Sequence, residues 1–219
     1  MKVTDGLHAF LWTSMSANNC NTFLIDGPAK ILIDPGHLHL FEHVAIQLRA
    51  LGIELSDIDV VLVTHAHPDH FEAARLFRNQ PALFAVSPED WRMIQEIGKH
   101  MGPMFDLDAY TPDFLLGPGD LNIKGIEMEV IPSPGHSPGS VALYWPARKA
   151  LFPGDVLFLD GLGRTDLPGG NGGALKQSIK ALESLDVDLL LPGHGGIISG
   201  GAQVRSNFKR AEEFWFRYI

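Results

Sequence analysis

Short apolar runs alternate with amphipathic stretches along the chain. An apolar run bounded by polar and turn residues, such as Val60–Thr64, is typical of a buried β-strand. The stretch His39–Gly52 instead carries Leu40, Val44 and Leu48 at helical spacing, and its final glycine is suited to end a helix. The predicted strands cover 21–26, 30–36, 60–64, 81–87, 126–132, 140–145, 149–155 and 187–192, and the predicted helices cover 39–52, 71–78, 91–100, 174–185 and 202–217.

The alternation of strands and helices continues through both halves without a linker rich in Pro, Gly and Ser. It therefore predicts one α/β domain over residues 1–219 that contains two sheets. Segment 88–114 departs from the alternation and is a candidate lid insertion that carries Trp91, Met101, Met104 and Phe105. Such thioether and aromatic side chains suit an apolar substrate, and equally a satellite core or a dimer contact. The aromatic C-terminal helix within 202–219 either caps the fold or joins two chains in a homodimer.

Composition and charge exclude several classes of function. With 45% hydrophobic and 20% charged residues, the chain is typical of soluble globular proteins. A net charge of −9 repels a phosphate backbone, which argues against nucleic acid as the main partner. The single cysteine, Cys20, cannot form an intrachain disulfide, and the first residues lack the apolar core of a signal peptide. We therefore expect a cytoplasmic protein that does not enter a membrane.

The ten histidines are the unusual part of the composition, because histidine is the commonest metal ligand. Four predicted strands end in a turn that delivers a potential ligand, and such turns at a rigid sheet edge are where folds place chemistry. One such residue alone is equally well explained by helix capping or solvent exposure, but four matching strand ends favour a metal site. The ligand candidates are His65, His67, Asp69, His70, His136, Asp155 and His194. The histidines that match no ligand motif, interpreted as surface or hydrogen-bonded residues, are His8, His37, His39, His43 and His100.

The spacing of the first histidines has a physical logic. His65 and His67 are two residues apart, so in an extended chain they point the same way, while Asp69 and His70 turn to a neighbouring position. Two sets of ligands then face two adjacent metals, and zinc accepts both imidazole nitrogen and carboxylate oxygen. Asp155 carries two carboxylate oxygens and is suited to bridge the metals. The first set is His65, His67 and His136, and the second set is Asp69, His70 and His194.

The same residues lie in motifs that resemble those of the metallo-β-lactamase superfamily. The motifs are LIDPG (32–36), THAHPDH (64–70), GHSPGS (135–140), PGD (153–155) and PGHG (192–195). The resemblance extends over nearly the whole chain and implies the ligand assignment above. It also implies an α/β fold of the αββα four-layer sandwich type, with the metals at one edge between two sheets. The resemblance implies that Asp34 holds the histidine loop, residues Thr64–His70, by hydrogen bonds. The alternative is that Asp34 is an ordinary turn aspartate.

Departures from the β-lactamases narrow the predicted activity. The β-lactamases whose motifs are arranged most similarly have a cysteine where this chain has Asp155. They also lack a histidine where this chain has His70, so true β-lactamase activity is not expected. The set resembles instead the glyoxalase II, lactonase, RNase Z and persulfide dioxygenase branches, and the acidic charge balance disfavours RNase Z. Segment Gly161–Asn171 resembles small glyoxalase II-like proteins and persulfide dioxygenases. Its Arg164 either pairs with a carboxylate such as Asp166 or meets an anionic substrate.

The predicted function is a metal-dependent hydrolase that cleaves a thioester or other activated ester through a metal-bound hydroxide. Asp69 and Asp155 are the predicted catalytic residues, and Asp69 is the expected partner of the nucleophile's proton. Two zinc ions are the expected cofactors, with one or two iron ions or manganese as alternatives. Because residues 195–219 suffice for a single helix, we expect a glyoxalase II-like enzyme without that family's longer glutathione-binding extension. The expected partner is a small-molecule ester or thioester substrate.

Three alternatives to this function stay open. A lactonase uses the same ligand set. A mononuclear-iron oxygenase, similar to the persulfide dioxygenases, needs only His65, His136 and Asp155 as its two-histidine, one-carboxylate site. A metal-binding module without catalysis is the third class.

Overall fold

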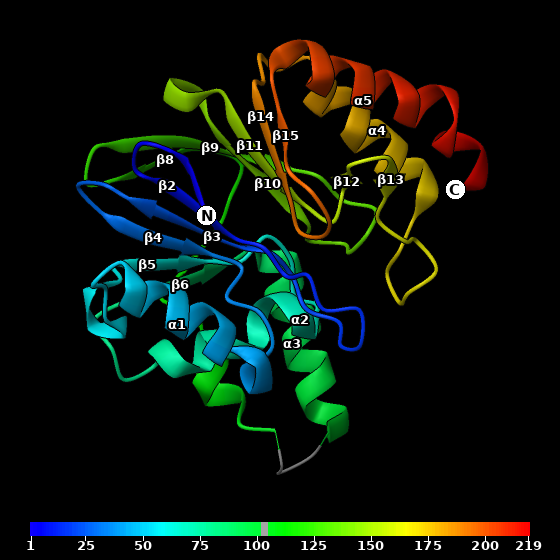
Figure 1. Cartoon of the computed structure of the whole chain (residues 1–219). Helices are drawn as coiled ribbons and strands as arrows, with labels where there is room; N and C mark the ends of the chain where they lie inside the picture. The colour runs from blue at the N-terminus through cyan, green and yellow to red at the C-terminus, as the bar shows by residue number, and fades with distance from the viewer. Residues whose placement is uncertain (102–104) are drawn as a thin grey trace. The chain divides into compact units, whose positions relative to one another are not determined.

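The computed structural model describes residues 1–101 and 105–219, which form two compact units. The first unit comprises residues 1–116 and 123–126, and the second comprises residues 117–122 and 127–219. Each unit contains a β-sheet with helices packed against it (Figure 1). The predicted alternation of strands and helices is therefore present in both halves of the chain.

The first unit is built on a seven-stranded sheet whose strands follow one another in chain order. Strands β1 to β4 pair antiparallel, whereas β4, β5, β6 and β7 pair parallel. Parallel strands end at the same edge of a sheet, so the loops that follow them are brought together. The strands are β1 (Lys2–Thr4), β2 (Leu7–Phe10), β3 (Thr22–Asp26), β4 (Lys30–Ile33), β5 (Val60–Leu62), β6 (Leu83–Val86) and β7 (Phe114–Leu115).

Helices of the first unit pack on the sheet through one continuous apolar cluster. Val44 and Leu48 of α1 and Ile94 of α3 share this cluster with Leu32 and Val61 of the strands. The burial of these residues on one helix face is what the apolar spacing predicts. The α-helices are α1 (Glu42–Ala50), α2 (Pro68–Phe71) and α3 (Pro88–Met101), and the 3-10 helices are η1 (Leu38–Leu40), η2 (Leu55–Asp57), η3 (Glu72–Phe77) and η5 (Leu107–Tyr110).

Two predicted helices of this unit differ from the observed ones. The helix expected over 39–52 is α1 alone, since residues 38–40 form the separate 3-10 turn η1. The helix expected over 71–78 is replaced by the short α2 followed by the 3-10 helix η3. The 3-10 helix still places the apolar residues Ala73, Ala74 and Phe77 in the core. Residues three positions apart, such as Ala74 and Phe77, lie on the same face of a 3-10 helix.

Aromatic residues of segment 88–114 pack onto the first unit. Trp91 and Phe105 lie against its apolar cluster, and the Phe105 ring stacks on Tyr110 with centroids 5.3 Å apart. Met104 and the side chain of Met101, which the lid interpretation also used, lie outside the described residues. A role of the segment as a lid stays a prediction.

The second unit is built on a six-stranded sheet in the order β15-β14-β11-β10-β9-β8. Helices α4 (Gly172–Glu183) and α5 (Gly201–Glu213) lie side by side on this sheet (Figure 1) and share an apolar cluster with it. Asn171 caps α4 by accepting a hydrogen bond from the Ala174 amide at 2.9 Å. The strands are β8 (Gly119–Ile123), β9 (Ile126–Pro132), β10 (Val141–Trp145), β11 (Ala150–Gly154), β14 (Leu189–Pro192) and β15 (Ile198–Ser199), with a small hairpin of β12 (Leu157–Phe158) and β13 (Gly161–Leu162).

The predicted C-terminal helix ends earlier than its apolar pattern indicates. Helix α5 stops at Glu213, and a 3-10 turn, η7 (Trp215–Tyr218), follows it. Within the part of the chain that the structure describes, no helix combines the length and the hydropathy needed to cross a bilayer.

Candidate metal centre

In the first unit, three parallel strands deliver polar loops to one edge of the sheet. Asp34 follows β4, Thr64–His70 follows β5, and Ser87–Asp90 follows β6. The registers Ile33↔Leu62 and Leu62↔Ala85 bring the three strand ends level with one another. This edge therefore carries four of the seven predicted ligands together with Asp34.

Three histidine rings of this loop converge. The ring centroids of His65 and His67 lie 4.8 Å apart, and those of His65 and His70 lie 4.0 Å apart. His65 and His70 are buried, whereas His67 is half-buried. Imidazole is the commonest metal ligand in proteins. The cluster thus has the chemistry of a metal site.

Asp34 fixes this loop with one buried carboxylate. Its Oδ1 accepts the Thr64 amide at 2.8 Å, and its Oδ2 accepts the Thr64 hydroxyl at 2.7 Å and His70 Nδ1 at 2.9 Å. The residue has a φ of +53°, a left-handed conformation that aspartate tolerates better than most residues. Asp34 therefore makes the hydrogen bonds that the family resemblance implies for it.

These hydrogen bonds assign the ring nitrogens that face a metal. A carboxylate accepts only, so His70 carries its proton on Nδ1, and Nε2 is the atom that would bind a metal. The Thr64 hydroxyl donates to Asp34, so it accepts from His65 Nδ1 at 3.1 Å, and His65 likewise presents Nε2. Hydrogen bonds of this kind orient metal ligands and raise their basicity.

Two residues that the sequence analysis did not single out support the same loop. Asn18 donates from Nδ2 to Asp69 Oδ2 at 2.6 Å, and the fully buried Asp90 accepts the Ala66 amide at 2.7 Å. Ser87-Pro-Glu-Asp90 matches the pattern of a helix capping box, which marks it as a helix start. A capping-box pattern predicts that the acidic side chain bonds the backbone at the helix start. It does not predict that the Asp90 carboxylate accepts the Ala66 amide of the histidine loop.

In the second unit, His136, Asp155 and His194 follow β9, β11 and β14. Asp155 Oδ2 lies 3.4 Å from His136 Nε2 and 3.4 Å from His194 Nε2. Ligand atoms bound at about 2.1 Å to one tetrahedral metal lie roughly 3.4 Å apart. The spacing therefore fits a carboxylate oxygen that shares a metal with each of the two histidines, so the residues present suit the metals that the fold implies.

The loop after β13 holds His136 in place. His136 Nδ1 donates to the Arg164 carbonyl at 2.8 Å, so Nε2 is the atom that would bind a metal. A Cβ on Gly163 would lie 1.7 Å from the Asp155 carbonyl oxygen, so only glycine lets this loop approach so closely. The loop is thus packed directly behind two of the predicted ligands.

The Arg164 side chain forms an ion pair within the same loop. Its Nε and Nη2 donate to the two carboxylate oxygens of Asp166, each at 2.7 Å. This bidentate hydrogen bonding lowers the pKa of Asp166 from its ordinary value to about 2. Of the two interpretations of Arg164, the structure shows the pairing with Asp166.

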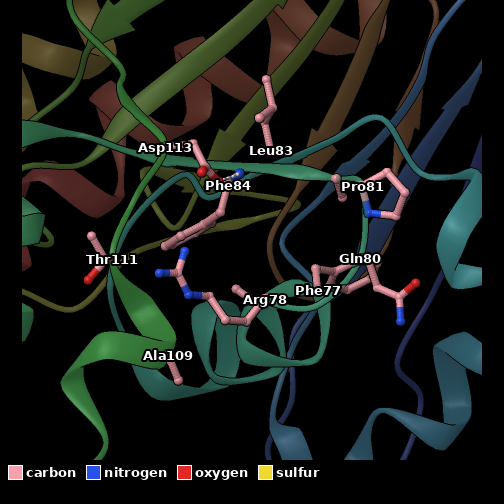
Figure 2. Close-up of a pocket in the computed structure, with 11 residues that line it drawn as sticks. Phe77, Arg78, Gln80, Pro81, Leu83, Phe84, Ala109, Thr111 and Asp113 are labelled. Carbon is pink, nitrogen blue, oxygen red and sulfur yellow. Dashed lines mark hydrogen bonds between the residues drawn. The ribbon is translucent and has the colours of Figure 1, made fainter.

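A pocket of the first unit has a lining without any of the predicted ligands. It is lined by residues of η3, β6, η5 and the loops that join them, among them Arg78, Phe84, Thr111 and Asp113 (Figure 2). Asp113 accepts the Phe84 amide at 2.8 Å (Figure 2). The lining of the pocket includes neither Asp34 nor any predicted metal ligand, so its chemistry is separate from that of the histidine loop.

Comparison with known proteins places the chain in a family. Residues 15–194 match the metallo-β-lactamase superfamily, so the chain belongs to that superfamily. The hydroxyacylglutathione hydrolase GloC of Haemophilus influenzae is 31% identical over 198 residues, which cover 86% of this chain and 91% of the relative. The probable metallo-hydrolase MJ0888 of Methanocaldococcus jannaschii is 32% identical over 187 residues, covering 81% of this chain and 88% of the relative.

Solved structures agree with this assignment. TTHA1623, crystallised in a di-iron-bound form, is 31% identical with a TM-score of 0.71 and covers 89% of this chain and 97% of its own. The family protein TTHA1429 of Thermus thermophilus reaches a TM-score of 0.77 at 21% identity and covers 97% of this chain and 80% of its own. The predicted family and its mixed α/β metallo-β-lactamase fold are confirmed, and the protein belongs among the metallo-hydrolases.

Proposed function

We propose that the protein is a metal-dependent hydrolase that cleaves a thioester or another activated ester. The observation that carries this proposal is the position of Asp155 Oδ2, 3.4 Å from both His136 Nε2 and His194 Nε2, where it suits a ligand shared by two metals. Together with the histidine loop of the first unit, the full proposed ligand set is His65, His67, Asp69, His70, His136, Asp155 and His194.

The protein residues have distinct roles in this proposal. When bound, divalent metals supply a nucleophile at neutral pH and polarise the carbonyl group of the substrate. Asp69 accepts the proton of the nucleophile, and Asn18 orients its carboxylate through Oδ2. Asp34 and the Arg164 carbonyl keep His70 and His136 in the tautomer that presents Nε2.

The relatives support a thioester as the substrate class. GloC is a hydroxyacylglutathione hydrolase, and hydroxyacylglutathione is a thioester. A lactone is the other activated ester that we include. With the Arg164 guanidinium paired to Asp166, we assign Arg164 to support of the loop behind His136, and we do not place it on the substrate.

The metals of this site are proposed to be two zinc ions, with iron as the first alternative. Nitrogen and carboxylate ligands in this ratio suit zinc, iron and manganese alike. The di-iron form of TTHA1623 is the observation that favours iron over manganese.

The test replaces Asp155 or His67 by alanine. Both variants are expected to lose the metal of this centre and hydrolysis of a thioester and ester panel together, because each removes a proposed ligand. The matched control is Asp160→Asn, an acidic position of the same segment whose side chain pairs with Arg210 at 2.7 Å. Full activity in either alanine variant would contradict the proposed two-metal hydrolase.

The mononuclear-iron oxygenase is kept as a second candidate because His65, His136 and Asp155 supply the two histidines and one carboxylate that such a site needs. Metal analysis of anaerobically purified protein separates the two functions. Two metal ions in this centre with thioester cleavage support the hydrolase. A single iron ion with oxygen consumption on a persulfide substrate, and no ester cleavage, would replace it.

A further inference from the structure

A second group of ligand-type side chains lies in the first unit, apart from the proposed metal ligands. It consists of His37, at the start of η1, His39, within η1, and Glu72, at the start of η3. The sequence analysis gave these histidines no ligand role. One donor atom from each of the three residues lies within 4.8 Å of the others.

The distances between the donor atoms of this group are close to those between the ligands of one bound metal ion. His37 Nδ1 lies 2.8 Å from Glu72 Oε2, and the ring centroids of His37 and His39 are 5.0 Å apart. Donor atoms on one tetrahedral zinc at about 2.1 Å are separated by roughly 3.4 Å. An ion that takes the place of the proton between His37 and Glu72 therefore needs to separate these two donors by only a fraction of an ångström.

The backbone around His37 is held by several hydrogen bonds. The His37 amide donates to Asn19 Oδ1 at 2.8 Å, the Gly36 amide donates to the His70 carbonyl at 3.1 Å, and the Ala73 amide donates to the Gly36 carbonyl at 2.9 Å. Gly36 has a φ of +90°, and a Cβ there would lie 2.8 Å from Asn19 Oδ1. The two segments that carry the ligands are thus fixed to each other before any ion binds, which reduces the entropic cost of binding.

The exposure of the group suits a site that keeps water on the ion. The His37 side chain is 19% exposed and that of Glu72 is 32% exposed, while His39 is exposed. Two imidazoles and one carboxylate are a ligand set that zinc accepts, and three protein ligands leave a coordination position for water. The net charge of −9 further favours a divalent cation.

We propose that His37, His39 and Glu72 bind an additional divalent transition-metal ion, of which zinc is the best match. The ion links η1 to η3 and so reinforces the Gly36–His70 and Ala73–Gly36 contacts behind the histidine loop. This site does not depend on the function proposed for the main centre.

The test compares the zinc content of His39→Gln with that of the wild type. The content is measured by mass spectrometry of the metal, after equilibration in a zinc buffer that saturates the main centre and the additional site of the wild type. The substitution is expected to lose one molar equivalent of zinc and to keep the equivalents of the main centre. Zinc added beyond saturation of the main centre should raise the melting temperature of the wild type and not that of the variant, because an ion that binds only the folded state stabilises it.

Two further variants control the experiment. His43→Gln alters a nearby histidine whose Nε2 bonds Gln47 at 3.0 Å outside the group, and it should keep the wild-type zinc content. Glu72→Gln preserves the size of the third ligand and should lose the same equivalent as His39→Gln. Equal zinc content in the wild type and His39→Gln would overturn the proposal, and so would loss of the equivalent in His43→Gln.

Discussion

A single side chain, Asp34, links the backbone of the histidine loop to the ligand atoms. Its buried carboxylate accepts one amide, one hydroxyl and one imidazole hydrogen bond. Hydrogen bonds to a charged acceptor are about twice as strong as neutral ones, and the low dielectric of the interior strengthens them further. The tautomers of His65 and His70 follow from this one residue.

Asp34→Asn is expected to weaken metal binding about 10- to 100-fold while the fold persists. Asparagine also tolerates a positive φ, but its amide has only one acceptor oxygen. It therefore cannot serve both the Thr64 amide, bound by Oδ1 of Asp34, and the Thr64 hydroxyl and His70 Nδ1, bound by Oδ2. Competition with a chelator measures the affinity. Asp160→Asn is the control. Asp160 also has a positive φ, +55°, but its carboxylate forms an exposed ion pair with Arg210, so the same substitution there leaves the histidine loop unchanged. Unchanged affinity in Asp34→Asn would remove the positioning role of Asp34.

Helix α3 acts on the histidine loop through its first turn. Asp90 and Glu89 are neighbouring acids at the helix start, where both favour the helix dipole. Only Asp90 is buried and accepts the Ala66 amide, whereas Glu89 pairs with Arg92 on the surface at 3.2 Å. The start of this helix is therefore also a support of the loop after β5.

Asp90→Ala should lower the free energy of unfolding of the metal-free protein by about 1–3 kcal/mol, because the buried Ala66 amide loses its acceptor. Glu89→Ala removes an exposed acid from the same turn and should change it by no more than about 0.5 kcal/mol. Urea denaturation of both variants makes the comparison. Equal effects of the two substitutions would mean that the Asp90 bond does not stabilise the loop.

The elements that the sequence analysis predicted well are those with a strong local pattern. The helices over 174–185 and 202–217 correspond to α4 and α5, and the apolar run at 60–64 corresponds to β5. Strands β7 and β15 have two residues each, too few to show alternation. Their existence depends on pairing with β6 and β14, which local sequence does not encode.

At the scale of the whole molecule, the proposed ligands come from both compact units. A metal that binds only the folded protein stabilises it by mass action. Removal of metal should then affect the stability of the entire protein and not only the loops that contain ligands.

Dialysis against a chelator is expected to lower the melting temperature of the wild type by several degrees, since about 1 kcal/mol corresponds to roughly 2–4 °C in a protein of this size. Asp155→Ala, which lacks a proposed shared ligand, should shift less than the wild type on chelation, because only the ion proposed at His37, His39 and Glu72 is left to remove. Calorimetry with and without added zinc provides the measurement. Identical midpoints for the loaded and chelated wild type would contradict the proposed centre.

The sequence by itself determined the family, the two sheets with their helices, and the candidate ligands. It did so because the ligands stand in short local motifs directly after apolar strands, where residue type and spacing carry the information. Tertiary structure alone decided which residues support them. Asn18 is 51 residues from Asp69, and Asp90 is 24 residues from Ala66, so no local pattern joins these pairs. The same holds for Glu72, which reaches His37 only because folding brings η3 beside η1.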